Sequence, residues 1–537
     1  MPTTTRTIDA AVAAAEALPH QDALGRLGQI PPALLLGALA ATAIRRSRLH
    51  WTWAALAAIL ALCLVPLFGS GARLAAVAAG WAALRARRRH RAELEAGADL
   101  AGAARARVRP TEAARELTAR IAEDTAVGRR LLDRLPRRKD DGMLVLGRDA
   151  SRRQVRVPFS PAEPGHTLIV GATGSGKTMT QTLLAERAIA DGRAVIVVDP
   201  KGDRAMRARL ADAAARGGRR LLEWTPAGPC SYNPYARGGE TEIADRLLAG
   251  ERFTEPHYLR QAQRYLGHAI RALRSCGREV DLAAIVEMLD PSALELLLRE
   301  AEPERAAAGH AYMDSLTERQ MRDLAGVRDR LAIVRESDVG RWLGADASFD
   351  LLDACRQGAV VLFGLEADSR PLLAQMIGAA IVADLQSTVA ALQGRPALTL
   401  VVIDEFSALG ARNVTALFGR ARSAGVSLLL GTQELADLRL PGADRLLEQV
   451  LGNISLLLGH RQVVPDSAEL LSRLAGNRGC WRVSWSTGRR TTRTRASEPV
   501  LDPQLLMGLS PGTAVAIGFG AGREVSLVQV RAAGGER

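Results

Sequence analysis

The residues best placed to do chemistry in this chain of 537 residues are two of its three lysines, Lys177 in GATGSGKT and Lys201 in VVDPKGD. The third lysine is Lys139, and the remaining 68 of the 71 basic residues are arginines. A lysine carries a compact ammonium on a flexible stem, whereas the guanidinium of arginine is a planar fork. Keeping lysine at these two positions therefore indicates contact with phosphate, and predicts a nucleotide-binding protein.

The segment around Lys177 reads G-x-x-x-x-G-K-T; it follows the apolar residues 167–170 and precedes residues 179–185, which suit a helix. This strand, loop and helix order is the context that a P-loop requires. Its glycines let backbone N–H groups wrap phosphates, Lys177 points at the outer phosphates, and Thr178 can hold Mg²⁺. The predicted cofactors are thus ATP and Mg²⁺, bound by Gly171, Thr173, Gly174, Ser175, Gly176, Lys177 and Thr178.

A second apolar run, residues 398–403, ends in two carboxylates, Asp404 and Glu405. Asp404 is the expected Mg²⁺ ligand. Glu405, one residue later, can polarise the attacking water, so hydrolysis is favoured over phosphoryl transfer to a small acceptor.

Further motifs follow in a fixed order: GRARSAG at 419–425, an apolar strand at 426–431 that leads into Thr432 and Gln433, and LGN at 451–453 before another apolar run. Together with GATGSGKT, VVDPKGD and VVIDEF, this series resembles the type IV secretion coupling ATPases of the TraG/TraD class. The motifs span about 290 residues, and their order is more specific than any one of them.

The resemblance implies roles for two more residues. Arg422, eleven residues before Gln433, would be an arginine finger on the nucleotide of a neighbouring subunit, and Gln433 would sense the γ-phosphate. A cation supplied by a neighbour offsets charge on the transferred phosphoryl group. Arg420 is a competing finger, and local capping of carbonyls is the alternative for Arg422 and Gln433; the sequence leaves these choices open, as it does the role of Lys201.

Composition agrees with a large protein of two to three folding units, with a mass of 57.3 kDa and 47% hydrophobic residues. Its five cysteines show no paired spacing, which predicts no disulfide framework, no zinc ribbon and a reducing cytoplasm around most of the chain. The net charge of +13 favours a polyanionic partner.

The N-terminal part has a membrane-like composition. Residues 30–44 and 51–72 are apolar runs long enough to predict two transmembrane helices, and a third, shorter run covers 74–84. Arginines lie both between the first two runs and at 85–91, so the number and orientation of the crossings stay open. A buried helical hairpin is the alternative.

The pattern predicts an α/β fold: a RecA-like P-loop NTPase with a parallel sheet, an inserted all-α domain and N-terminal transmembrane helices. The predicted domains are a membrane anchor at 1–84, a basic helical linker at 85–140, the ATPase domain at 141–239 and 345–537, and the all-α insertion at 240–344.

Within this scheme, strands are expected at 194–198, 359–363, 398–405, 426–431 and 454–459, with helices at 372–392 and near 414–422. A strand pair is expected within 143–159 and an edge hairpin at 514–519 with 525–530. The segment 486–495 holds four arginines among hydroxyls and fits either phosphate contact or an exposed loop.

The function that these observations and the resemblance predict is that of a membrane-anchored, hexameric ATPase. It would recruit DNA, single-stranded and bound to a relaxase, and drive it through a type IV secretion channel in conjugation. It would sit in the bacterial inner membrane with its ATPase domain in the cytoplasm. Export of protein effectors, an FtsK-like DNA translocase, and a nucleotide-switched membrane receptor with little turnover are the alternatives.

Overall fold

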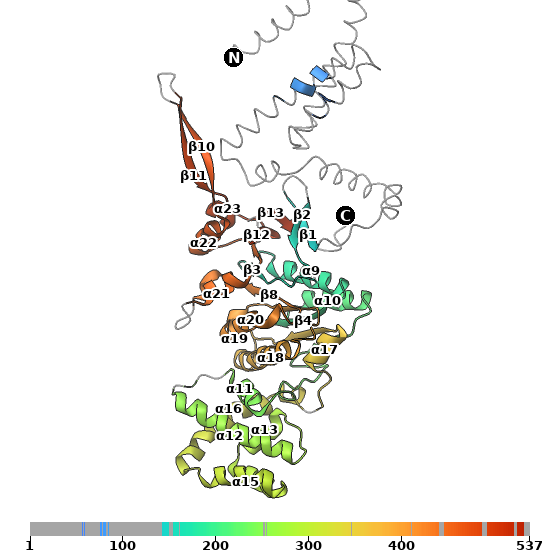
Figure 1. The fold of residues 1–537 in the computed structure, drawn as a ribbon, viewed down its shortest axis with the longest axis vertical. Coiled ribbons are helices and arrows are strands. Elements are labelled where there is room, and N and C mark those ends of the chain that lie inside the picture. Colours follow the sequence, from blue (N-terminus) through green and yellow to red (C-terminus); the bar gives the residue numbers. More distant parts are fainter. Residues whose placement is uncertain are drawn as a thin grey trace, which may run out of the picture. The chain divides into compact units, whose positions relative to one another are not determined.

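A computed structural model describes most of the chain from Gly142 to Val530 and a few positions between Leu56 and Leu84. The described ranges are 142–149, 154–160, 162–250, 253, 255–344, 346–409, 411–439, 445–485, 491–519 and 524–530, with 56, 58, 59, 76, 77, 79–81 and 84. The chain forms two compact units, drawn in Figure 1. One comprises Met1–Arg138, Asp149–Arg153 and Asn477–Val500, and the other the remaining residues.

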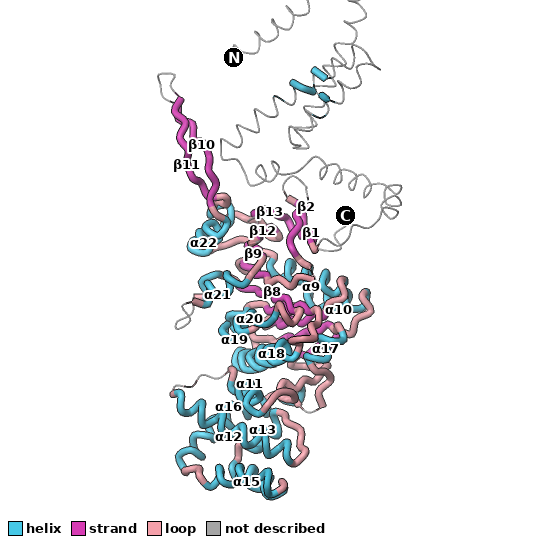
Figure 2. Tube along the Cα trace, viewed as in Figure 1, coloured by secondary structure: helices cyan, strands magenta, loops and turns pink. Residues whose placement is uncertain are grey.

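The second unit is built on a sheet of eleven strands in the order β2-β1-β13-β12-β9-β3-β8-β7-β4-β6-β5 (Figures 1 and 2). The seven strands from β9 to β5 are parallel to one another. They are β3 Thr167–Val170, β4 Ala194–Asp199, β5 Leu221–Trp224, β6 Val360–Gly364, β7 Thr399–Ile403, β8 Val426–Thr432 and β9 Leu456–Gly459. This confirms the predicted parallel α/β sheet, including every strand expected from 194 to 459; β5 was not predicted.

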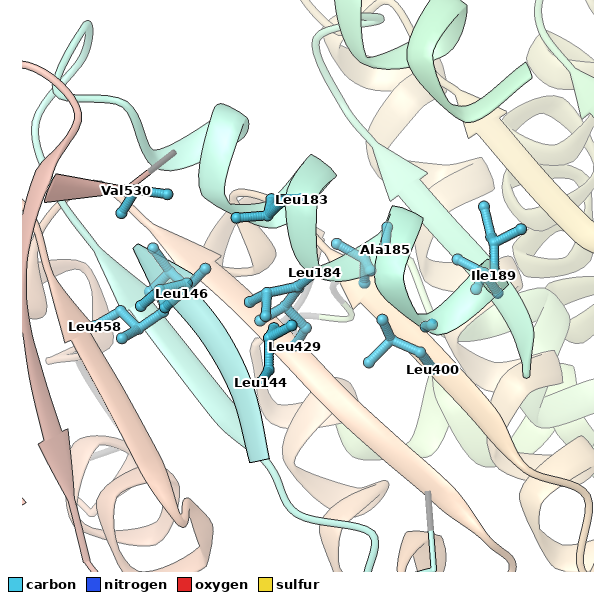
Figure 3. Close-up of a cluster of buried hydrophobic side chains, with 14 of the residues drawn as sticks. Leu144, Leu146, Leu183, Leu184, Ala185, Ile189, Leu400, Leu429, Leu458 and Val530 are labelled. Atoms are coloured by element: carbon cyan, nitrogen blue, oxygen red, sulfur yellow. The ribbon is translucent and has the colours of Figure 1, made fainter. Parts of the chain in front are cut away.

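The parallel strands read as continuous apolar runs because both faces of the sheet are covered. Val197 and Val402 lie in one core cluster with Leu184 of helix α9 (Lys177–Ala190), while Val361 and Val401, of opposite strand parity, are also buried. Figure 3 shows Leu184 of α9 next to strand residue Leu429, with Leu183, Ala185 and Ile189 of the same helix in the same buried cluster as Leu400 and Leu458. Burial of this many aliphatic side chains, each stabilising by about 1.5–3 kcal/mol, fixes helix α9 against the sheet.

Four antiparallel strands extend the sheet beyond β9: β12 Thr513–Gly518, β13 Glu524–Val530, β1 Met143–Arg148 and β2 Gln154–Pro158. The predicted strand pair within 143–159 and the hairpin near the C-terminus are thereby confirmed. The expected edge position of that hairpin was wrong, because β12 pairs with β9 and β13 pairs with β1. A glycine is needed for the second pairing, since a Cβ on Gly147 would clash with the carbonyl oxygen of Gln529.

Between β5 and β6 the structure is helical, with few other elements. Arg246 of α11 (Glu240–Leu248) is buried and pairs with buried Asp384 of α18 (Pro371–Ala391) at 3.0 Å, and the Tyr232 hydroxyl also donates to Asp384. This network joins the inserted helices to α18, the helix between β6 and β7. The insertion consists of α11 Glu240–Leu248, α12 Pro256–Ser275, α13 Leu282–Met288, α14 Pro291–Glu300, α15 Pro303–Asp314, α16 Glu318–Glu336 and the 3-10 turn Gly340–Trp342.

The remaining helices connect the strands. The helix expected at 414–422 is divided at Leu417, whose N–H donates to Val414 three residues back, as in a 3-10 turn. The elements are α10 Arg204–Arg216, α17 Leu351–Gln357, α18 Pro371–Ala391, α19 Ala411–Ala416, α20 Phe418–Ala421, α21 Leu446–Asn453, α22 Pro465–Ala475, α23 Pro503–Met507, and the 3-10 turns Phe406–Leu409 and Leu435–Leu438.

In the first unit, β10 (Asn477–Trp485) and β11 (Thr491–Pro499) form a two-stranded antiparallel sheet. The expectation of an exposed loop at 486–495 was therefore wrong for residues 491–495, which belong to β11; residues 486–490 lie outside the described part. Threonine and arginine alternate at residues 492–495 of β11, and this polar composition gave no sign of a strand.

Most residues of the predicted membrane segments lie outside the described part; Leu56, Ala58, Ile59, Ala76 and Trp81 are among the described positions and are helical. Among described residues, one helix, α18, has the length and apolar composition to cross a membrane. In α18 67% of that apolar window is buried, as expected for a helix packed inside a globular unit.

Candidate nucleotide site

The P-loop follows β3, which lies between β8 and β9. Helix α9 begins at Lys177 with no side-chain cap and no acidic residue in its first turn, so the N–H groups at its positive end are available to an anion. Gly174 and Gly176 have φ of 73° and 104°, which favour glycine, and a Cβ on Gly174 would meet nothing within 4 Å. The loop thus forms an open, positively polarised cradle.

The other side of the P-loop is packed tightly against its neighbours. The carbonyl of Ser175 accepts from Gly512 N–H at 2.8 Å, and a Cβ on Gly176 would come within 2.8 Å of the same nitrogen. Buried His460, after β9, accepts from the Thr180 hydroxyl at 3.0 Å through Nε2 and donates to the Thr513 carbonyl at 3.1 Å through Nδ1. Burial lowers the pKa of His460 to about 4, so a neutral ring supports the loop.

Lys177 meets both predicted carboxylates. Its Nζ lies 2.6 Å from Glu405 Oε1 and 3.6 Å from Asp404 Oδ1, and all three residues are buried. The three side chains come from α9 and from the turn after β7, which are more than 220 residues apart in sequence. The sheet therefore brings the predicted phosphate-binding lysine and the predicted catalytic carboxylates to one place.

Glu405 has a left-handed backbone, with φ of 44°. Such a conformation in a residue other than glycine costs about 1–3 kcal/mol and persists where its surroundings hold it. Lys201 Nζ also reaches Glu405 Oε1, at 3.0 Å. Burial raises the pKa of the Glu405 carboxyl, but hydrogen bonds and charge from Lys177 and then Lys201 outweigh burial and hold that pKa below its usual value.

Two functional candidates, Gln181 and Asp199, escaped the sequence analysis. Gln181 Nε2 donates to Asp404 Oδ1 at 2.9 Å, and a Cβ on Gly431 of β8 would clash with both atoms. Asp199, at the end of β4, accepts from the N–H groups of Lys201 and Asp203. Burial raises the pKa of Asp199. Gln181 lies one helical turn after Lys177, and Asp199 ends an apolar strand as Asp404 does; these were the available signals.

Gln433 and Arg422 lie at opposite ends of β8. Gln433 follows the strand at its carboxyl end, where Oε1 accepts from the P-loop hydroxyl of Thr173 at 3.4 Å. Exposed Arg422 precedes the amino end and donates to the Asn453 carbonyl at 2.8 Å. The seven residues of β8 span about 20 Å, so the structure brings Gln433 to the P-loop and leaves Arg422 away from it.

A sequence profile of the family described as type IV secretion-system coupling protein DNA-binding domain matches residues 154–498. The chain belongs to this family. The resemblance inferred from the motifs is thereby confirmed.

Solved structures of coupling proteins share the fold. The unbound form of the bacterial conjugative coupling protein TrwBdeltaN70 aligns with a TM-score of 0.56 at 17% identity, over 75% of this chain and 91% of that one. TrwB in complex with ADP and Mg²⁺ aligns with a TM-score of 0.55 at 17% identity, over 75% of this chain and 92% of that one. An uncharacterised protein of Mycoplasma pneumoniae is 30% identical over 104 residues, which are 19% of this chain and 69% of that protein.

Proposed function

We propose that this coupling-family protein hydrolyses ATP at the P-loop with the help of Mg²⁺. The observation that carries the proposal is the contact of Lys177 Nζ with Glu405 Oε1 at 2.6 Å beside Asp404. A P-loop lysine, a metal-binding aspartate and a base for water are the parts that ATP hydrolysis requires. TrwB, a member with the same fold, was solved with an ATP analogue and with ADP and Mg²⁺, which supports the choice of nucleotide.

The residues present fit a magnesium ion. Thr178 and Asp404 would hold it, and hydroxyl and carboxylate oxygens are suitable ligands. Two buried polar atoms close by, Gln181 Oε1 and Ser175 Oγ, have no hydrogen-bond partner among the described residues, as expected where the shell of an ion and its phosphates supplies the partners. The ion, when bound, neutralises charge on the outer phosphates.

Each side chain of the site then has its own role in hydrolysis. Lys177 leaves Glu405 for the outer phosphates, and the freed Glu405 carboxylate accepts the proton of the attacking water. Gln181 keeps Asp404 in its orientation. Gln433, next to Thr173, lies where the γ-phosphate end of the nucleotide is expected, which supports its proposed role as a sensor.

Arg422 acts on the nucleotide of a neighbouring subunit. Its place at the amino end of β8, about 20 Å from its own P-loop, supports a trans role because it cannot reach its own nucleotide. Arg420 is the competing finger. A finger from the neighbour requires a ring, and we propose a homo-hexamer, in which hydrolysis at one interface is coupled to the next.

The cargo that we propose is DNA, single-stranded and bound to a relaxase, delivered to a type IV secretion channel in conjugation. The DNA-binding domain for which the family is named supports this cargo. Charge is distributed unevenly along the sequence. Residues 1–138 hold 21 arginines and 11 acidic residues, and residues 477–500 hold six arginines and one acidic residue. These two segments exceed the whole net charge of +13, so attraction to a polyanion belongs to them rather than to the sheet.

We further propose that residues 1–84 anchor the protein in the bacterial inner membrane and that 85–140 form a basic linker. The ATPase domain, 141–239 with 345–537, would face the cytoplasm and carry the all-α domain 240–344. The apolar runs at 30–44 and 51–72 support the anchor. Retention of the full-length protein in membranes after a carbonate wash, and its release when residues 1–84 are deleted, test this arrangement.

ATP turnover by the full-length protein in detergent, with and without single- and double-stranded DNA, tests the function. We expect Mg²⁺-dependent turnover that DNA stimulates and that rises per subunit with protein concentration. Glu405→Gln controls for contaminating ATPases and must abolish it. Turnover indifferent to DNA would favour the export of protein effectors, and tight binding with negligible turnover would favour a nucleotide-controlled switch.

A further inference from the structure

Lys201 occupies a braced turn between β4 and α10. The Asp199 carboxylate accepts the N–H groups of Lys201 at 2.9 Å and of Asp203 at 2.5 Å. The turn also pairs with the segment after β6, where Leu365 N–H donates to the Asp199 carbonyl and Ala367 N–H to the Pro200 carbonyl. The backbone of Lys201 is thus held by parts of the sheet that are independent of the P-loop.

Two ammonium groups share one carboxylate oxygen in this structure. Lys177 Nζ lies 2.6 Å and Lys201 Nζ 3.0 Å from Glu405 Oε1. Like charges this close repel each other, so each lysine weakens the hold of the other on that oxygen. The lysine ammonium is a compact point charge on a flexible stem, which suits two cations that converge on one oxygen and fits the use of lysine at both positions.

The two lysines differ in burial and in what else they have to do. The Lys177 side chain is 6% exposed and that of Lys201 42% exposed. In the proposed mechanism Lys177 must leave Glu405 for the phosphates, whereas Lys201 comes from another turn and need not move. Without a second cation, Glu405 would lose its only charged partner among the described residues in a strained, left-handed backbone.

We propose that Lys201 is a positioning residue that retains the Glu405 carboxylate when Lys177 moves to the nucleotide, and that lowers the cost of that exchange by weakening the Lys177–Glu405 pair beforehand. The inference rests on the proposed ATPase function. It predicts that Lys201 acts on nucleotide binding only through Glu405, and on turnover through the orientation of Glu405.

Binding of a fluorescent, non-hydrolysable ATP analogue to the full-length protein tests the first part. In Lys201→Met the remaining Lys177–Glu405 pair is harder to break, so the analogue should bind about three- to tenfold more weakly. In the Glu405→Gln background the same substitution should change the affinity less than about twofold. An equal loss in both backgrounds would show that Lys201 only supports the fold, and would overturn the proposal, as would the absence of any loss.

Steady-state turnover tests the second part. We expect kcat of Lys201→Met to fall about tenfold or more, because a misplaced base is inefficient, and Lys201→Arg to recover part of that loss by restoring the charge. Lys201→Gln, which keeps a polar side chain, is the second variant. Lys139→Met, which removes the third lysine of the chain, is the matched control. Unchanged kcat in Lys201→Met and Lys201→Gln would overturn the proposal.

The outcome for the wild type separates this inference from the function on which it rests. A wild type that neither binds nor hydrolyses ATP contradicts the proposed function itself. A wild type that hydrolyses ATP, beside Lys201 variants with wild-type binding and kcat, contradicts only the role of Lys201.

Discussion

The two ends of the parallel strands, called here the carboxyl edge and the amino edge of the sheet, are built differently. At the carboxyl edge, Lys177, Asp404 and Glu405 are buried and contact one another, and Lys201 and Gln181 brace the carboxylates. At the amino edge, Arg422 is exposed and its guanidinium is bound to a backbone carbonyl, that of Asn453. The first arrangement pairs charges within the subunit, and the second presents a cation at the surface.

Under the proposed function, this difference would let the two ends of one strand act on two nucleotides. β8 carries Gln433 at the edge where its own nucleotide would bind and Arg422 at the other, about 20 Å away. A hydrogen bond to a carbonyl orients the Arg422 guanidinium without neutralising its charge. In the proposed ring, the carboxyl edge would form most of one site, and the amino edge would contribute to the site of the next subunit.

The largest expected effects come from the carboxyl edge. Lys177→Ala should abolish both nucleotide binding and turnover, since it removes the cation on the outer phosphates. Glu405→Gln should abolish turnover but bind ATP at least as tightly as the wild type, because Lys177 is released from its carboxylate partner. Equilibrium binding and turnover, measured on the same preparations, check this; equal loss of binding in both variants would contradict it.

The amino edge should affect turnover alone. Arg422→Ala should lower kcat about a thousandfold, the lower end of the range for arginine fingers. Nucleotide affinity of the isolated subunit should not change, since Arg422 lies away from its own P-loop. Arg420→Ala is the comparison, and a larger loss in that variant would transfer the role to Arg420.

A smaller effect is expected at the brace of the carboxyl edge. Gly431→Ala places a Cβ against Gln181 and Asp404, so kcat should fall about tenfold to a hundredfold, and stability by about 1–3 kcal/mol through overpacking. Gly419→Ala, where a Cβ meets nothing within 4 Å, is the control. Kinetics and urea unfolding measure both, and wild-type behaviour of Gly431→Ala would contradict the role of Gln181.

The smallest effect concerns a feature that the two edges share, a buried histidine. Burial lowers the pKa of His460 at the carboxyl edge and of His166 at the amino edge from 6.5 to about 4. Between pH 4 and pH 6.5 the unfolded chain therefore binds more protons than the folded one. The contribution of each histidine to the free energy of unfolding is fully present above about pH 6.5, and about 3 kcal/mol of it is lost as the pH falls to about 4. Urea midpoints against pH should show this decline, halved in His460→Gln or His166→Gln; an unchanged slope in the double variant would contradict it.

The elements that the sequence predicted are those with strong local signals. The P-loop and strands β3, β4, β7 and β8 follow from glycine spacing and apolar runs, because a parallel strand covered on both faces needs no polar positions. β5 is only four residues long and contains Glu223, and residues 492–495 of β11 alternate threonine with arginine, so neither strand stands out as an apolar run. The interior place of the hairpin β12–β13 depends on β1, which joins it from the other end of the described chain.

The sequence named the residues of the candidate site, but it could not predict their contacts. Lys177, Asp404 and Glu405 belong to motifs, and the structure brings them together. The brace of Gln181 on Asp404, the support of the P-loop by His460 and the sharing of Glu405 by two lysines join residues more than 200 positions apart. No local pattern encodes such contacts.

Mixing two inactive variants is the most direct test of the claim that the two edges serve different nucleotides. Lys177→Ala and Arg422→Ala are purified separately, with different tags that verify exchange into common rings, and ATP turnover is measured before and after mixing. A trans finger predicts recovered turnover, because Arg422 of one variant meets the intact P-loop of the other at about a quarter of the interfaces. Mixed rings no more active than the separate variants would contradict the account and place both residues on the same nucleotide.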